Sequence, residues 1–259
     1  MLIDSHCHLH LSPLREKIDS VISRAEANNV RVLQMVSITI SRFQSLLSIA
    51  NKYKNVFCSV GEHPLNVGKK NTITYERLIS LSNNNKVTAI GETGLDYSLK
   101  EDSAMLQQDV FIKHIYAAQE TGLPLIIHSR NADIDMVKIL RSEMKKKTFT
   151  AVIHCFTSSR RMAYECLDMG FYISASGIVT FKNAKDLQTL FQTIPKNKIL
   201  IETDSPYLSP VPFRGTINEP ANLIYTAKFL AKLLNISDKE LYEITSKNYY
   251  SLFNKAEYY

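Results

Sequence analysis

Two histidines, His6 and His8, stand two residues apart inside a short apolar segment at the start of the chain. Side chains at positions i and i+2 of an extended strand point to the same face, so both imidazoles can bind one cation. Imidazole is a common ligand for Zn²⁺ and related divalent metals. The pair is weak evidence on its own, because a complete site needs donors from elsewhere in the chain.

Those donors follow four later apolar runs. The runs end just before Glu92, His128, His154 and the segment that holds Glu202 and Asp204. The carboxyl ends of parallel strands meet at one edge of a sheet, so these side chains are expected to converge. Imidazoles and carboxylates gathered in this way are costly to bury unless cations compensate them. The pattern predicts a metal site.

The framework that must position these donors alternates strands and helices. We predict eight strands, at about 2–6, 32–37, 56–61, 87–92, 124–128, 150–155, 171–176 and 198–203. Helical spacing separates them, and helices near 220–234 and 237–252 follow the last strand. Eight strands that alternate with helices predict an α/β chain folded as a single-domain (β/α)8 TIM barrel over 1–259. The alternative, an open doubly wound sheet, needs a glycine-rich turn after the first strand, where this chain has a histidine-rich one.

Composition is that of an ordinary globular protein. The 259 residues are 45% hydrophobic, and no run approaches the length of a membrane span. The chain starts without a signal-peptide pattern, so we expect a cytoplasmic protein with no membrane partner. Four widely spaced cysteines are too few for a disulfide scaffold and are expected to be reduced. A formal net charge of +6 favours an anionic partner without identifying it.

The number of donors favours two ions over one, since two cations about 3.5–4 Å apart can share a carboxylate. We predict that His6, His8 and Asp204 bind the first ion, that His128 and His154 bind the second, and that Glu92 bridges them. Such a pair lowers the pKa of a water molecule and polarises an electrophile. Asp204 can also accept the proton of that water, as a ligand and a general base.

The sequence resembles the TatD family of metal-dependent deoxyribonucleases, within the amidohydrolase-like barrel superfamily. The matching motifs are DSHCHL at 4–9, GEHP at 61–64, AIGETGLDY at 89–97, IIHSR at 126–130, IHCF at 153–156, SASGIVTFK at 174–182 and ETDSPYL at 202–208, followed by Arg214-Gly215 and Asn218-Glu219-Pro220. Together they cover nearly the whole chain, which makes the resemblance specific.

The resemblance implies a divalent-metal nuclease that removes nucleotides from DNA ends, with 3′ to 5′ polarity on single strands in several members. It also supports the ligand assignments made above. Single-stranded DNA is therefore the expected partner. Ligand softness favours Zn, Mn or Co as the two divalent ions, whereas family behaviour indicates that Mg supports turnover.

Further roles follow for residues near the ligands. His63 is expected to hold the scissile phosphate or the attacking water, which places it with Asp204 and Glu92 as catalytic. The expected substrate-binding residues are Arg214, Arg130, Tyr97 and Glu202. Each of these residues has an alternative role. Arg214 could form a structural salt bridge, Arg130 could hold a ligand in place, and Tyr97 could serve in packing. Glu202 could accept a hydrogen bond from a ligand histidine or bind a further ion.

The chain departs from the family pattern at three places. His10 stands where an acidic or amide residue is common, and Thr216-Ile217 replaces a Lys-Arg pair. Glu62 stands beside His63 where relatives usually have an apolar residue. The lost cations and the added carboxylate are expected to weaken attraction to the DNA backbone.

Two other function classes remain open. The same barrel supports hydrolases of amide or C–N bonds, many of which bridge their metals with a carboxylated lysine. Here the bridge position holds Glu92, which favours a phosphodiesterase. The second alternative is a non-catalytic barrel that binds nucleic acid or protein and keeps its metals for stability.

Overall fold

Eight parallel strands form one sheet in which every strand pairs with its neighbour in sequence. The computed structural model describes residues 1–68, 73–98 and 103–258. The strands, in the order in which they pair, are β1 (Leu2–Cys7), β2 (Val30–Met35), β3 (Val56–Val60), β4 (Val87–Asp96), β5 (Leu125–Arg130), β6 (Ala151–Ile153), β7 (Tyr172–Ala175) and β8 (Ile199–Ile201). The predicted (β/α)8 barrel is confirmed.

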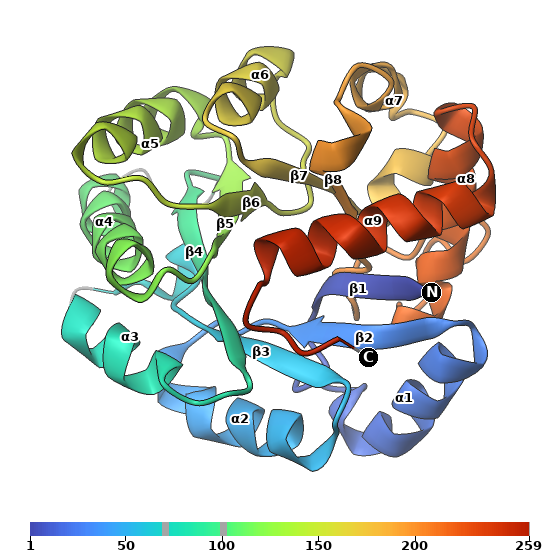
Figure 1. Cartoon of the computed structure of the whole chain (residues 1–259), viewed down its shortest axis with the longest axis horizontal. Coiled ribbons are helices and arrows are strands. Elements are labelled where there is room, and N and C mark those ends of the chain that lie inside the picture. The colour runs from blue at the N-terminus through green and yellow to red at the C-terminus, as the bar shows by residue number, and fades with distance from the viewer. Residues whose placement is uncertain (69–72, 99–102, 259) are drawn as a thin grey trace.

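Helices surround the sheet as an outer layer, except the last, which lies across one end of the barrel (Figure 1). They are α1 (Ile18–Ala27), α2 (Phe43–Lys52), α3 (Tyr75–Ser82), α4 (Ala104–Thr121), α5 (Asp133–Lys146), α6 (Arg160–Asp168), α7 (Lys185–Phe191), α8 (Leu223–Leu233) and α9 (Asp238–Leu252). Serine caps fix two of the starts: Ser159 accepts a hydrogen bond from the amide of Met162, and Ser237 accepts one from the amide of Glu240. Within the described residues, no helix has the length and apolar character needed to cross a membrane.

Hydrogen bonds between the ends of β1 and β8 bring the first and last strands together. The hydroxyl of Ser5 donates to the carbonyl of Ile201 at 2.9 Å. Just beyond β8, the amide of Asp204 donates to the carbonyl of His6 at 2.9 Å. The closure therefore places residues nearly 200 positions apart next to each other.

The α9 helix fills the opposite end of the barrel, where the strands begin. Figure 1 shows it lying across this opening. Tyr249 of α9 is buried among side chains from the strand starts, including Val32 and Ile126. Its hydroxyl donates to the side-chain oxygen of Gln34 at 2.9 Å. Because this end is packed shut, only the carboxyl ends of the strands are open for a site.

The β4 strand is longer than the sequence predicts and runs on past Glu92 to Asp96. Glycines permit this extension. A Cβ atom at Gly94 would lie 2.0 Å from the carbonyl oxygen of His128, and Gly94 has a φ of +139°. Only a residue without a side chain lets β4 approach β5 this closely. The register then pairs Gly94 with His128 and Asp96 with Arg130.

Candidate metal centre

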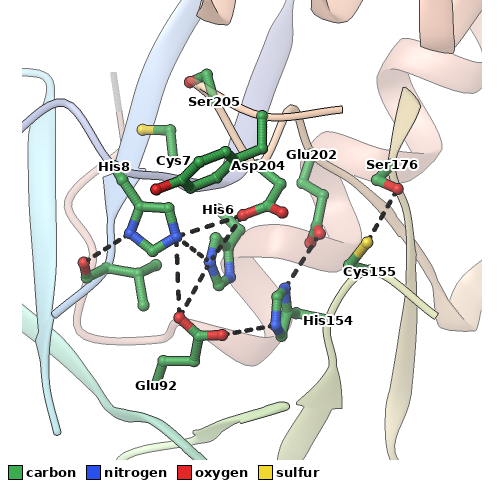
Figure 2. Close-up of polar contacts among 12 residues, drawn as sticks. His6, Cys7, His8, Glu92, His154, Cys155, Ser176, Glu202, Asp204 and Ser205 are labelled. Atoms are coloured by element: carbon green, nitrogen blue, oxygen red, sulfur yellow. Dashed lines mark hydrogen bonds and ion pairs between the residues drawn. The ribbon is translucent and has the colours of Figure 1, made fainter. Parts of the chain in front are cut away.

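One oxygen of Glu92 faces the first group of predicted ligands (Figure 2). Its Oε2 atom lies 3.6 Å from Nε2 of His6 and 3.8 Å from Nε2 of His8. The Oδ1 atom of Asp204 lies 3.6 Å from the first of these nitrogens and 3.3 Å from the second. The two imidazole nitrogens are 3.2 Å apart. Donors from the end of β1, from β4 and from the segment after β8 therefore surround one position that a cation could occupy.

The other oxygen of Glu92 faces a second group. Its Oε1 atom lies 2.8 Å from Nε2 of His154 and 3.3 Å from Nδ1 of His128. Nε2 of His63, from the loop after β3, lies 3.4 Å from the same oxygen. The two carboxylate oxygens therefore divide the donors into the same two sets that the sequence analysis proposed, and His63 joins the second.

The donor atoms suit divalent cations. Four ligands held about 2.0–2.1 Å from Zn²⁺ in a tetrahedron are separated by about 3.3 Å, close to the separations within both groups. The Oε2 atom of Glu92 and the Nδ1 atom of His6 are buried and have no hydrogen-bond partner among the described residues. Buried polar atoms without partners are rare, and a bound cation satisfies the carboxylate oxygen.

The charges of the site also require compensation. Burial opposes ionisation of Glu92, but the surrounding imidazoles, His63 foremost, hold the pKa of its carboxyl well below the ordinary value. Burial lowers the pKa of His6, whereas at His154 the carboxylates of Glu92 and Glu202 together outweigh burial and raise the pKa. The rings of His6 and His154 stack with centroids 3.9 Å apart, so both cannot be cationic without strong repulsion.

A second layer of contacts orients the ligand rings. Nε2 of His128 lies 2.9 Å from a carboxylate oxygen of Asp96, and Nδ1 of His154 lies 3.3 Å from Glu202. Outer carboxylates of this kind fix the orientation of a histidine and increase its basicity as a ligand. Asp96 is absent from the predicted site. The alternation of Glu92, Gly94 and Asp96 along β4 is the signal that identifies it, once the strand is known to extend that far.

The predicted substrate residues lie in different environments. Glu202 is fully buried behind His154, so its predicted place among the substrate-binding residues is revised to a brace for that ligand. Arg130 is exposed at the end of β5. The hydroxyl of Tyr97 donates to Asp135 at 3.1 Å, which fixes the ring beside α5. Arg214 is exposed and makes no salt bridge within the described residues.

The three departures from the family pattern have distinct surroundings. The carboxylate of Glu62 accepts hydrogen bonds from the amide of Ile40 at 2.8 Å and from the hydroxyl of Thr39, so its charge stabilises a neighbouring loop. The expected weakening of DNA attraction by this charge stays a prediction. The ring of His10 lies 5.8 Å from that of His8, between centroids. Ile217, in the loop after β8, is 60% exposed.

Comparisons with known proteins agree with this geometry. A family model described as TatD related DNase matches residues 3–254. An uncharacterized metal-dependent hydrolase of Buchnera aphidicola is 45% identical over 264 residues, covering 98% of this chain and 99% of the relative. The uncharacterized metal-dependent hydrolase YcfH of Escherichia coli is 40% identical, covering 98% and 96%. The crystal structure of YjjV, a TatD homologue from Escherichia coli, superposes with a TM-score of 0.90 at 26% identity over 98% of both chains.

Proposed function

The chain belongs to the TatD family of metal-dependent hydrolases, and on that premise we propose that it is a deoxyribonuclease that removes nucleotides from the 3′ ends of single-stranded DNA. The observation that carries the proposal is the division of the donors by Glu92: each oxygen of one carboxylate faces its own set of ligands. This arrangement suits two divalent ions, Zn, Mn, Co or Mg, that act on one phosphodiester.

The ligands would hold the ions as two sets, with Glu92 common to both. When bound, the ions supply Lewis acidity towards phosphoryl oxygens and make a water molecule acidic enough to react near neutral pH. The protein keeps the donors fixed by burial: the side chains of His6 and His8 are at most 5% exposed. Preorganised donors need no rearrangement as charge develops in the transition state.

Some side chains at the centre remain reachable from outside. Those of Asp204 and His63 are each 14% exposed, and among the metal ligands His128, at 19%, is also reachable, whereas Glu92 is only 3% exposed. We assign to Asp204 the acceptance of the proton from the attacking water, because a carboxylate beside that water acts as a general base. We assign to His63 the positioning of the scissile phosphate or of the water.

Cationic side chains further out are assigned to the rest of the substrate. Arg130 and Arg214 present guanidinium groups that pair bidentately with phosphate oxygens. The loop after β8 has Thr216-Ile217 in place of a basic pair, so fewer backbone charges are neutralised there. We therefore expect the affinity for DNA to depend only modestly on salt.

Two further features bear on the proposal. The bridging position holds a glutamate, whereas many relatives that hydrolyse C–N bonds use a carboxylated lysine there; this supports phosphodiester chemistry. All four cysteines are free, which suits a reducing compartment and supports the expected cytoplasmic location.

The test is product mapping on 5′-labelled single-stranded oligonucleotides with each ion in turn, beside a cyclic amide as the alternative substrate. We expect a ladder shortened from the 3′ end, abolished in Glu92→Ala and Asp204→Asn. The control is Asp168→Asn, which removes an equivalent charge on the surface of α6. Hydrolysis of the amide alone, or equal nuclease activity in all variants, would overturn the proposal.

A further inference from the structure

A cavity of about 1320 Å³ opens beside the metal centre. Its walls are Tyr97 after β4, the end of β5, the loops that follow β5, β6 and β7, the first residues of α5 and α6, and α7. None of the proposed metal ligands lines it. It is a separate compartment that adjoins the strand ends from which His128 and His154 project, and its size is sufficient for a ligand larger than the reacting phosphate.

Two guanidinium groups line this cavity without a carboxylate partner. Arg130 and Arg160 make no salt bridge among the described residues; Arg160 has only a 3.5 Å contact with the hydroxyl of Tyr164. Unpaired arginines at the wall of a cavity are available to bind an anion.

Three carboxylates also line the cavity, those of Asp133, Asp135 and Asp186, and the first two accept hydrogen bonds from neutral donors. One oxygen of Asp133 accepts hydrogen bonds from the amide and the hydroxyl of Ser159, at 3.0 and 2.5 Å. One oxygen of Asp135 accepts from the hydroxyl of Tyr97 and from Gln108, both at 3.1 Å. These bonds hold the starts of α5 and α6 in place. The three carboxylates outnumber the two guanidinium groups, so binding of an anion here depends on the positions of Arg130 and Arg160 and not on the net charge of the cavity.

Arg130 is placed close to the reacting centre. It follows His128 by two residues on β5, so the two side chains leave the same face of the strand about 7 Å apart along it. A group bound by Arg130 therefore lies next to, and not on, the phosphate held at the metal centre.

Apolar surfaces accompany the cations. Phe181 lines the cavity, and the guanidinium of Arg214 lies 4.4 Å from the centre of its ring. Ile134, also in the lining, is 84% exposed at the start of α5. Exposed apolar and aromatic side chains interleaved with arginine are typical of surfaces that bind single-stranded nucleic acid, where bases stack and phosphates pair with cations.

We propose that this cavity binds the part of a single-stranded oligonucleotide that continues beyond the scissile bond. Arg130 and Arg160 bind phosphates next to the one that reacts, and Phe181 with Ile134 contacts a base. The inference rests on the proposed nuclease function and deepens it: the preferred substrate is an oligonucleotide of several residues, and a lone phosphate ester lacks most of the contacts.

The experiment compares wild type with Arg160→Gln and Phe181→Ala on single-stranded oligonucleotides of two to ten nucleotides and on bis(4-nitrophenyl) phosphate. Arg31→Gln is the control, because it removes the same charge at the opposite end of the barrel, where β2 begins. We expect the kcat/KM of wild type to rise with length. In both cavity variants the loss on the ten-nucleotide substrate exceeds the loss on the small ester by at least about tenfold, mainly through KM.

Binding gives an independent readout. Fluorescence anisotropy of a labelled ten-nucleotide strand, measured in EDTA, is expected to show weaker binding by Arg160→Gln and a salt slope smaller by about 0.7. Cavity variants that bind and cleave long strands as the control does would overturn the inference while the nuclease function stands. A wild-type protein that cleaves neither substrate would overturn the proposed function, and this inference with it.

Discussion

The hydroxyl of Thr203 donates a 2.5 Å hydrogen bond to one oxygen of Asp4, and the amide of Thr203 donates a 2.9 Å bond to the other. Asp4 lies in β1, two residues before His6, and Thr203 directly precedes Asp204. The pair therefore fixes the relative positions of two ligand segments from opposite ends of the chain. Both residues are buried, so neither can exchange its partner for bulk water.

Replacing Thr203 by valine is expected to weaken metal binding about 10–100-fold, the usual cost of losing a contact that orients ligands. The free energy of unfolding should fall by about 1–3 kcal/mol, because the Asp4 carboxylate loses a hydrogen bond while it stays buried. Competition with a chelator measures the first effect and urea denaturation the second. Thr203→Ser keeps the hydroxyl and should restore most of both; equal losses in the two variants would contradict this role.

Asp96 is predicted to act through His128. Burial opposes ionisation of Asp96, but the hydrogen bonds with His128 and Ser98 together outweigh it and lower the pKa of the carboxyl. Asp96→Asn keeps the shape but removes the charge, and should reduce the affinity for the proposed second ion about 10–100-fold. Metal analysis after dialysis against a weak chelator should then find less than wild-type metal per chain. Wild-type retention of both ions would show that Asp96 does not support the ligand.

Much of this site follows from the sequence, because a parallel barrel brings the residues after its strands to one end whatever the details of packing. That rule alone placed His6, Glu92, His128, His154 and Asp204 within one cluster. It could not assign Asp96, since the glycines of β4 resemble a turn until the close approach to β5 is known. It also could not tell that the Glu62 carboxylate turns towards Ile40, which depends on the path of the neighbouring loop.

The approach of β4 to β5 gives a prediction about stability. Gly94→Ala puts a methyl group where the carbonyl of His128 lies and should destabilise the protein severely, by about 3 kcal/mol or more. Gly122→Ala is the matched control: Gly122 has a φ of +70°, and no atom lies near its added Cβ, so only the backbone cost of about 1–2 kcal/mol applies. Urea denaturation measures both. Similar losses would show that the contact with β5 is unimportant.

His114 of α4 is expected to make stability depend on pH. It is buried; Nδ1 donates to the carbonyl of Val110 at 2.7 Å and Nε2 accepts from the amide of Glu62 at 3.1 Å, so only the neutral ring fits. Burial lowers its pKa to about 4, below the unfolded value of about 6.5. Between these values the unfolded chain binds more protons, so the contribution of His114 is lost as pH falls through this window.

At pH 5 this loss should reach about 2 kcal/mol of unfolding free energy relative to pH 7.5. Other buried histidines add to the total, so the measurement is the difference between wild type and His114→Gln, whose amide oxygen can still accept the Glu62 bond. Urea denaturation at the two pH values should show a smaller change in the variant. An identical change in both proteins would contradict the assignment.

The most direct test of the proposed two-ion centre is anomalous diffraction from crystals of the wild-type protein saturated with Mn²⁺ or Zn²⁺. We expect two peaks, one on each side of Glu92: the first among His6, His8 and Asp204, the second beside His128 and His154. A metal-saturated crystal with an ion on one side of Glu92 alone, or with no ion among these donors, would contradict the proposal.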